Sequence, residues 1–90
     1  MKKHFNLRIK GKVQGVWFRA STLQKAKELS LCGFVRNEAN GEVYLEVEGQ
    51  DPALTMFFDW CKEGPELARV DAIQFEEQAL KHFSSFEIIS

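Results

Sequence analysis

The residues best suited to chemistry form one short run, residues 11–19, which reads Gly-Lys-Val-Gln-Gly-Val-Trp-Phe-Arg. Its glycines give the backbone freedom to turn, because glycine accepts positive φ angles at little cost. Successive backbone N–H groups in such a turn can converge on an anion. Arg19 ends the run, and a guanidinium can hold a phosphate through two parallel hydrogen bonds. The run therefore predicts a phosphate pocket built from a loop and one arginine.

The residues on either side of this loop predict the elements that hold it. Residues 4–10 alternate between apolar and polar side chains and predict a half-buried strand. Its core side is expected to carry Phe5, Leu7 and Ile9. Residues 20–31 predict a helix, with Gly33 as its C-terminal glycine cap. The apolar stripe of this helix is expected to carry Ala20, Leu23, Ala26 and Leu29.

Two further strands are predicted to form a hairpin. Residues 34–39 and 42–48 flank Asn40-Gly41, which is the strongest short signal for a hairpin turn. Asn40 is expected there because asparagine tolerates left-handed geometry. The core side of the second strand is expected to carry Val43, Leu45 and Val47, and its outer side Glu42, Glu46 and Glu48.

The second half of the chain predicts one helix and two strands. Asp51-Pro52 supplies an N-cap residue and a proline at the first helical position, and Gly64-Pro65 ends the helix. The core stripe of this helix is expected to carry Leu54, Phe57, Phe58 and Cys61. Residues 68–76 predict a strand with a bulge at residues 72–73, where the alternation slips. Residues 83–89 predict a last, edge-type strand.

This order of elements predicts an α+β fold. Strand, helix, strand, strand, helix and strand, in that order, form a two-layer ferredoxin-like βαββαβ sandwich. Its sheet is expected to be mostly antiparallel, with both helices on one face and an extra C-terminal edge strand. The other face is expected to be polar and open to water. We expect residues 1–90 to form a single domain of this kind.

Composition and charge argue against several classes of protein. The 90 residues carry a net charge of −1, with an isoelectric point of about 6.1, which argues against a protein that binds nucleic acid through bulk positive charge. No apolar run approaches the roughly 20 residues needed to cross a bilayer. Residues 1–3 lead into an alternating strand rather than a signal-peptide core. We therefore expect a cytoplasmic protein with no membrane partner, whose Cys32 and Cys61 are reduced, buried thiols.

Two long motifs give the chain a resemblance to the acylphosphatases. Residues 11–19 resemble the first signature of that family. The second signature is carried, at the family's spacing, by Gly33-Phe34-Val35-Arg36-Asn37, Gly41, Val43 and Gly49. The family's later segments are matched by Gly64-Pro65, Ala68, Val70 and Phe86-Glu87-Ile88. The resemblance thus covers essentially the whole chain.

The resemblance implies a reaction and the residues that perform it. Acylphosphatases hydrolyse acyl phosphates, which are mixed carboxylic–phosphoric anhydrides, to a carboxylate and inorganic phosphate without a metal or organic cofactor. The motif arginine holds the phosphate and the motif asparagine positions the attacking water, and by position these are Arg19 and Asn37. The loop amides that also hold the phosphate are those of Gln14, Gly15, Val16, Trp17 and Phe18. The expected partner is a small acyl phosphate, with phosphate or sulfate as a competing anion, and we expect a monomer.

The chemistry of the two side chains fits these roles. Arg19 stays charged at any physiological pH and can neutralise the phosphoryl oxygens. Asn37 cannot act as a general base, but its amide can accept from water and donate to it, so its expected role is orientation. The proton of the water is then expected to pass to a phosphate oxygen of the substrate.

A second interpretation is a non-catalytic ferredoxin-like module that binds an anion or a protein partner. The presence of both Arg19 and Asn37 favours the enzyme, because a binding module needs no amide that positions water. His4 and His82 lie outside both motifs and are expected to be non-catalytic. Trp17, inside the loop, could either rim the pocket or anchor the loop.

Two positions depart from the family pattern. Many relatives carry an aromatic residue directly after the motif arginine, where this chain has Ala20, and many carry Ser or Thr at the position of Glu42. These departures concern contacts at the rim of the pocket and not the reaction itself.

Overall fold

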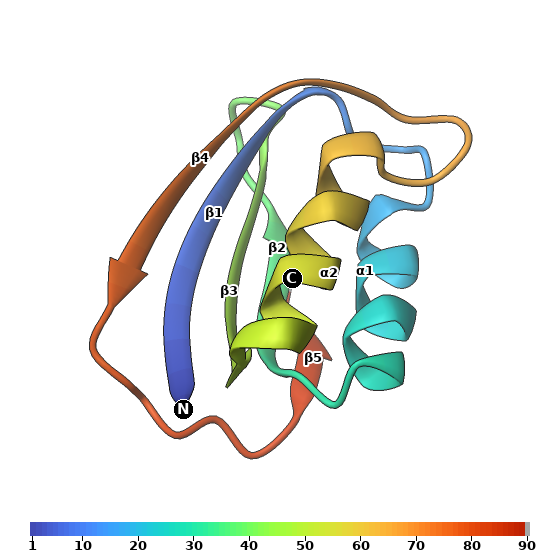
Figure 1. Cartoon of the computed structure of the whole chain (residues 1–90). Helices are drawn as coiled ribbons and strands as arrows, with labels where there is room; N and C mark the ends of the chain where they lie inside the picture. The colour runs from blue at the N-terminus through green and yellow to red at the C-terminus, as the bar shows by residue number, and fades with distance from the viewer. Residues whose placement is uncertain (90) are drawn as a thin grey trace.

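The computed structural model describes residues 1–89, which form five strands and two helices (Figure 1). In chain order these are β1 (Lys2–Lys12), α1 (Phe18–Glu28), β2 (Cys32–Asn37), β3 (Val43–Gln50), α2 (Asp51–Glu63), β4 (Arg69–Gln78) and β5 (Phe86–Ile88). The predicted order of elements is confirmed. None of the helices in this part of the chain is long and apolar enough to span a membrane.

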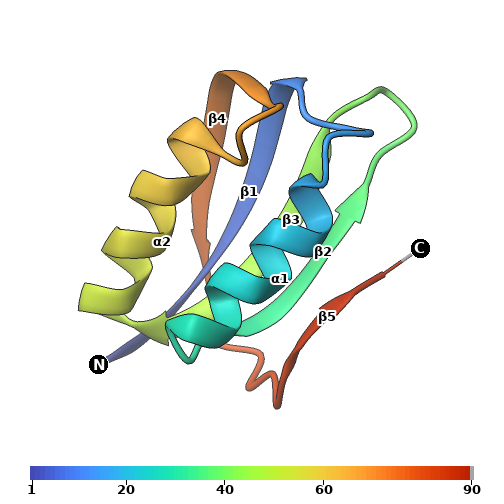
Figure 2. The same cartoon turned by 90° about the vertical axis from the view of Figure 1, so that its right-hand side faces the viewer.

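The strands form one sheet in the order β4-β1-β3-β2-β5. All neighbours are antiparallel except β2 and β5, which run parallel. Figures 1 and 2 show α1 and α2 side by side on one face of this sheet. The predicted two-layer ferredoxin-like sandwich, with its extra C-terminal edge strand, is therefore confirmed.

The core lies between the sheet and the two helices. The strands contribute alternating apolar side chains that are fully buried, namely Leu7, Ile9, Val35, Val43, Leu45 and Val47. Helix α2 buries Leu54, Phe57 and Cys61, as predicted, while Phe58, the fourth residue of the predicted stripe, is half-buried. Helix α1 differs from the prediction because it begins at residue 18 rather than 20. Its buried stripe is Phe18, Thr22 and Ala26 at a spacing of four residues, and Ala20 is exposed.

The predicted glycine cap of α1 is wrong. The helix ends at Glu28, and Ser30 takes the left-handed conformation with φ 57°. Gly33 lies inside β2, where a Cβ would sit 1.9 Å from the carbonyl oxygen of Glu46. Glycine is needed here because the backbone takes φ 144°, a conformation that would direct a Cβ into the neighbouring strand, and not because a helix ends.

The hairpin between β2 and β3 is confirmed, but its geometry differs from the prediction. The Glu38 N–H donates to the Glu42 carbonyl at 2.8 Å, which leaves a loop of residues 39–41. Gly41 alone takes a positive φ, of 92°. Asn40 instead accepts a hydrogen bond from the Glu42 N–H through its side-chain oxygen, at 3.1 Å.

Several element boundaries differ from the prediction; β1, for example, extends over Lys2–Lys12 rather than residues 4–10. Asp51 is the first helical residue of α2, and Gln50 is its N-cap. The bulge in β4 falls at Asp71, because Lys10 pairs with Ala72 while the next residue of β1 pairs with Val70. The last strand, β5, is also shorter than the predicted residues 83–89.

The polar face of the sheet is less open than predicted. Strands β4 and β5 lie at opposite edges, so the segment of residues 79–85 between them has to cross the sheet, and Figure 1 shows it passing the start of β1. This segment buries three polar side chains that were expected to face water, which are His4, Glu46 and Glu48.

These buried side chains are held by hydrogen bonds to the crossing segment. The carboxylate of Glu48 accepts the backbone N–H groups of Lys81, His82 and Phe83. His4 lies between two acceptors, with Nδ1 2.7 Å from the Ala79 carbonyl and Nε2 2.8 Å from the Glu46 carboxylate. Both ring nitrogens of His4 are therefore within hydrogen-bond distance of an acceptor.

The Glu46 carboxylate has two further donors. The Tyr44 hydroxyl donates at 2.7 Å and the Lys81 ammonium at 3.1 Å. The polar face thus contains a fully paired network, which we call the strap network: His4, Tyr44, Glu46, Glu48 and the segment of residues 79–85.

Candidate active site

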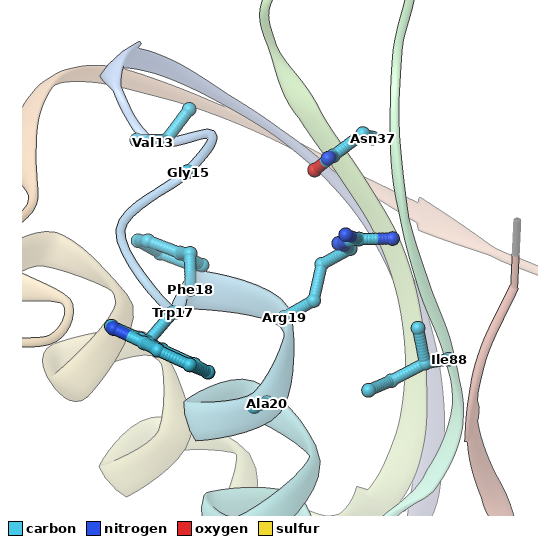
Figure 3. A pocket seen from close by; sticks show the side chains of 8 residues that line it. All are labelled: Val13, Gly15, Trp17, Phe18, Arg19, Ala20, Asn37 and Ile88. Atoms are coloured by element: carbon cyan, nitrogen blue, oxygen red, sulfur yellow. The ribbon is translucent and has the colours of Figure 1, made fainter.

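A pocket of about 430 Å³ opens at one end of the sheet, between the β1–α1 loop and the ends of β2 and β5. Figure 3 shows the side chains that line it. They are Val13, Gly15, Trp17, Phe18, Arg19, Ala20, Asn37 and Ile88. The loop, the first turn of α1 and two neighbouring strands therefore meet around a single cavity.

The loop that forms one wall of the pocket has an unusual backbone. Gly15 and Trp17 both take left-handed conformations, with φ 73° and φ 67°. Val16, between them, does not, and its side chain is buried in the core with that of Val13. Two buried valines hold this loop in place, and its alternation of left-handed residues is the backbone pattern from which anion-binding nests of successive N–H groups are built.

Helix α1 begins directly after this loop and points its N-terminus at the pocket. The first helical hydrogen bond is donated by the Ser21 N–H to the Trp17 carbonyl. The N–H groups of residues 18–20 precede that bond and have no partner within the helix. The first turn carries no acidic residue. Free N–H groups and the positive end of the helix dipole favour an anion at this position.

Arg19 supplies the positive side chain of the pocket. Figure 3 shows it extending from the first turn of α1 across the cavity toward β2. Within residues 1–89 it forms no ion pair. The other arginines, each paired with a carboxylate, are Arg8, Arg36 and Arg69. The charge of Arg19 is therefore available to a ligand.

Asn37 is the last residue of β2 and faces the same cavity. It shares the helix-facing side of the strand with Val35, while Arg36 lies on the opposite face over the ring of Tyr44. Figure 3 shows the amide of Asn37 projecting toward the loop. Among the described residues, its Oδ1 is the buried side-chain oxygen with no hydrogen-bond partner. A buried acceptor of this kind is rare unless a ligand or water completes it.

The remaining lining is apolar and partly exposed. The side chain of Trp17 is 74% exposed and that of Ile88 41%. Because its indole is not buried, Trp17 cannot anchor the loop, and Val16 does so instead. Of the two roles left open by the sequence, the geometry favours the rim of the pocket.

The structure brings most, but not all, of the predicted site side chains together. Arg19, Asn37, Gly15, Trp17 and Phe18 line one cavity. The side chain of Val16 lies in the core, and that of Gln14 points away to the β2–β3 hairpin. These two residues reach the loop wall only through their backbones.

Sequence reasoning missed Ile88 as a pocket residue. Ile88 lies on β5, which pairs in parallel with β2, so that Val35 lies opposite Ile88. The only signal was the closing segment of residues 86–88, whose resemblance to the family's later segments did not indicate a place beside the loop.

The other reactive side chains lie away from this pocket. His4 belongs to the strap network and His82 to the crossing segment. Both cysteines are free; Cys32 is half-buried rather than buried, and Cys61 is buried in α2, where burial raises the pKa of its thiol. Residues 1–89 contain no group of three His, Cys, Asp or Glu side chains placed to hold a metal ion.

Comparison with known proteins gives one consistent family. The acylphosphatase family model matches residues 5–88. An acylphosphatase from Marinobacter nauticus is 47% identical over 83 residues, which cover 91% of this chain and 90% of that protein. The structure of an acylphosphatase from Coxiella burnetii superposes with a TM-score of 0.94 at 35% identity, covering 98% of this chain and 93% of that one. That of an acylphosphatase from Bacillus subtilis superposes with a TM-score of 0.95 at 31% identity, covering all of both chains.

Proposed function

The chain belongs to the acylphosphatase family, and from this premise we propose that Arg19 and the loop amides bind the phosphoryl group while Asn37 orients the attacking water. The enzyme hydrolyses acyl phosphates to a carboxylate and inorganic phosphate. In this reaction the oxygen of water bonds to phosphorus, and the bond between phosphorus and the acyl oxygen breaks. The carboxylate leaves with the electron pair of that bond.

The phosphoryl group is placed between Arg19 and the N-terminus of α1. Catalysis of phosphoryl transfer depends mainly on positioning the reactants and on stabilising charge on the equatorial oxygens. Arg19 has no ion-pair partner within residues 1–89, and the N–H groups that begin α1 are free of helical partners. The amides of residues 14–18 complete the proposed cradle. Phosphate and sulfate are proposed to compete for it because they present the same oxygens.

The observation that carries the proposal is the unpartnered Oδ1 of Asn37 in the same cavity as Arg19. This oxygen can accept an O–H of water and hold its lone pair toward phosphorus, which lowers the entropic part of the barrier. Among the described residues that line the pocket, Arg19 alone is titratable. The water proton is therefore proposed to pass to a phosphoryl oxygen of the substrate, with no metal or organic cofactor involved.

The acyl group is proposed to rest on the apolar rim formed by Trp17, Ala20 and Ile88. A carboxylate is already a good leaving group, so this side of the site needs no general acid to protonate it. Substrates are therefore proposed to be small acyl phosphates, with contact at the rim deciding which acyl groups fit best.

We further propose that residues 1–90 act as one domain, as a cytoplasmic monomer that binds neither membranes nor nucleic acid. The two free thiols are compatible with a reducing compartment. On the exposed part of the sheet, Arg8 and Arg36 both pair with Glu38, which reduces the positive charge that nucleic acid would require.

The test is hydrolysis of benzoyl phosphate in excess EDTA by the wild type, Arg19→Ala and Asn37→Ala. Arg19→Ala should lose both turnover and binding of inorganic phosphate, measured by calorimetry. Asn37→Ala should keep the phosphate affinity while kcat falls by about 10²–10³-fold, as for an interaction made mainly in the transition state. Tight phosphate binding by Arg19→Ala, or normal turnover by Asn37→Ala, would refute the corresponding role.

A further inference from the structure

The two proposed catalytic side chains come from parts of the chain that the sheet does not hold together. Arg19 follows β1 and Asn37 ends β2, and β3 lies between these strands. The ladders place Ile9 and Asn37 on either side of Val43, and the pairing of β1 with β3 ends there. The loop of residues 13–17 begins beyond that last pair. Backbone pairing alone therefore does not fix the distance between the loop and Asn37.

The side chain of Gln14 bridges this gap. Its Nε2 donates to the carbonyl of Glu38 at 2.7 Å and to the carbonyl of Glu42 at 2.9 Å. Each carbonyl already accepts one backbone N–H of the hairpin, from Gly41 and from Glu38 respectively. A carbonyl oxygen has two lone pairs and a primary amide has two N–H protons, so this single side chain uses all the remaining capacity of both carbonyls.

These two bonds are the hydrogen bonds that join the loop of residues 13–17 to the hairpin of residues 37–42 within the described part of the chain. One of them ends on Glu38, the residue directly after Asn37. A displacement of the hairpin relative to the loop would therefore move the Asn37 amide relative to the proposed phosphate cradle. In catalysis, misplacement by about 1 Å can cost on the order of 10²-fold in rate.

We propose that the Gln14 side chain is a positioning residue, which sets the water-orienting amide of Asn37 relative to the anion-binding loop. This inference rests on the proposed function of Asn37. It assigns to the Gln14 side chain a task distinct from the phosphate binding proposed for its backbone amide. The task requires two donors on one nitrogen, so it depends on the amide and not on side-chain volume.

Gln14→Glu is the sharpest test, because it keeps the shape of the side chain and replaces the donating nitrogen with an oxygen facing two carbonyls. Turnover of benzoyl phosphate should show kcat reduced by about 10–100-fold, with the affinity for inorganic phosphate within about threefold of wild type. Gln14→Met, which also lacks donors but adds no charge, should show the same split. The retained phosphate affinity reports that the fold and the loop are intact.

Asn40→Ala is the matched control. It removes the hydrogen bond from the Glu42 N–H within the hairpin turn and leaves the Gln14 bridge in place. Its kcat should stay within about twofold of wild type. A loss of kcat equal to that of Gln14→Glu would mean that any loosening of the hairpin suffices, and it would overturn the specific role of Gln14.

A double-mutant cycle with Asn37→Ala decides whether Gln14 acts through Asn37. In the Asn37→Ala background, Gln14→Glu should lower kcat by less than about twofold, because the group it positions is already gone. Additive losses would overturn the inference, since they would mean that Gln14 acts elsewhere. If Asn37→Ala alone keeps full kcat, the proposed function of Asn37 fails. If Asn37→Ala is impaired and both Gln14 variants are fully active, the positioning role alone fails.

Discussion

Two polar clusters lie on opposite faces of the same sheet. They differ in whether their polar side chains have hydrogen-bond and ion-pair partners within the described part of the protein. In the strap network, the Glu46 carboxylate has three donors and Glu48 accepts three backbone N–H groups. In the pocket, Arg19 forms no ion pair within residues 1–89 and the buried Oδ1 of Asn37 has no hydrogen-bond partner there. The first cluster is complete within the fold, and the second is not.

This difference separates stability from function. A buried polar group costs free energy unless a partner replaces the water it has lost. In the strap network the partner is the crossing segment of residues 79–85, so pairing stabilises the fold. In the pocket the missing partners are those that, in our proposal, a phosphate and a water supply. Variants in the pocket should therefore change activity with little effect on stability, and variants in the strap network should do the reverse.

The largest effect is expected for Arg19→Lys. An ammonium keeps the charge but lacks the planar fork that binds two phosphoryl oxygens at once. We expect kcat/KM for benzoyl phosphate to fall by about 10²–10³-fold, with the midpoint of thermal unfolding unchanged. Arg36→Lys is the control, because Arg36 adjoins Asn37 in sequence but pairs with Glu38 on the opposite face. Equal losses in the two variants would contradict the division between the clusters.

The next largest effect is expected for Glu48→Ala, and here it falls on stability. Removing the carboxylate leaves the backbone N–H groups of the crossing segment without their acceptor, which we expect to lower the free energy of unfolding by about 2–3 kcal/mol. Urea unfolding measures this loss. Glu77→Ala, at an exposed position on β4, should be neutral. A folded Glu48→Ala protein should keep wild-type kcat. A selective loss of kcat at full stability would contradict the assignment of the strap network to stability rather than activity.

The strap network also marks the limit of what the sequence could predict about the fold. Alternation and helical spacing predicted every element, because one buried face imposes a period on each. The same alternation put Glu46 and Glu48 on the outer face of β3 correctly, but it could not reveal that residues 79–85 cross that face. The crossing follows from the places of β4 and β5 at opposite edges of the sheet, and strand order is a property of the whole chain rather than of any segment.

The pocket was more predictable because its parts are local. The loop, the helix start and Arg19 are contiguous, and the second motif supplied Asn37. Ile88 and the bridge from Gln14 were missed, since each depends on a neighbour distant in sequence. Local patterns also misplaced the left-handed residues: Asn40 has no positive φ angle, whereas Trp17, Ser30 and His82 do among the non-glycine residues of the described part of the chain.

The pH dependence of stability also distinguishes the strap network from the pocket. Burial by itself raises the pKa of Glu46, but the hydrogen bonds from Tyr44, Lys81 and His4 outweigh it and leave the pKa below its ordinary value of 4.5. Glu48 is shifted in the same direction, with the backbone N–H groups of residues 81–83 outweighing burial. A carboxylate with a lowered folded-state pKa contributes stability that is complete above the unfolded value and is lost as the pH falls through the folded one.

The free energy of unfolding should therefore fall as the pH drops below about 4.5. Glu46→Gln should show a weaker dependence over the same range, measured by urea unfolding at a series of pH values. The pocket should behave differently, because none of the described residues that line it is a carboxylate or a histidine. A stability that stays flat on acidification, or a kcat governed by an enzyme group that titrates near neutrality, would contradict this assignment.

The smallest effect is expected at Trp17, which tests the rim of the pocket rather than its charged centre. The indole is 74% exposed and sits on a residue with φ 67°, so it contributes little packing and holds a conformation that glycine adopts more easily. Trp17→Gly should therefore leave the stability unchanged or slightly higher, whereas Trp17→Ala should be slightly lower. If the indole contacts the acyl group, both variants should lose about fivefold in the preference for benzoyl over acetyl phosphate, as expected for about 1 kcal/mol of aromatic contact.

Met56→Ala is the control, because Met56 is another exposed apolar residue, on α2, and this variant should leave that preference unchanged. An unaltered preference in both Trp17 variants would place the acyl group on the Ala20 and Ile88 side of the pocket instead.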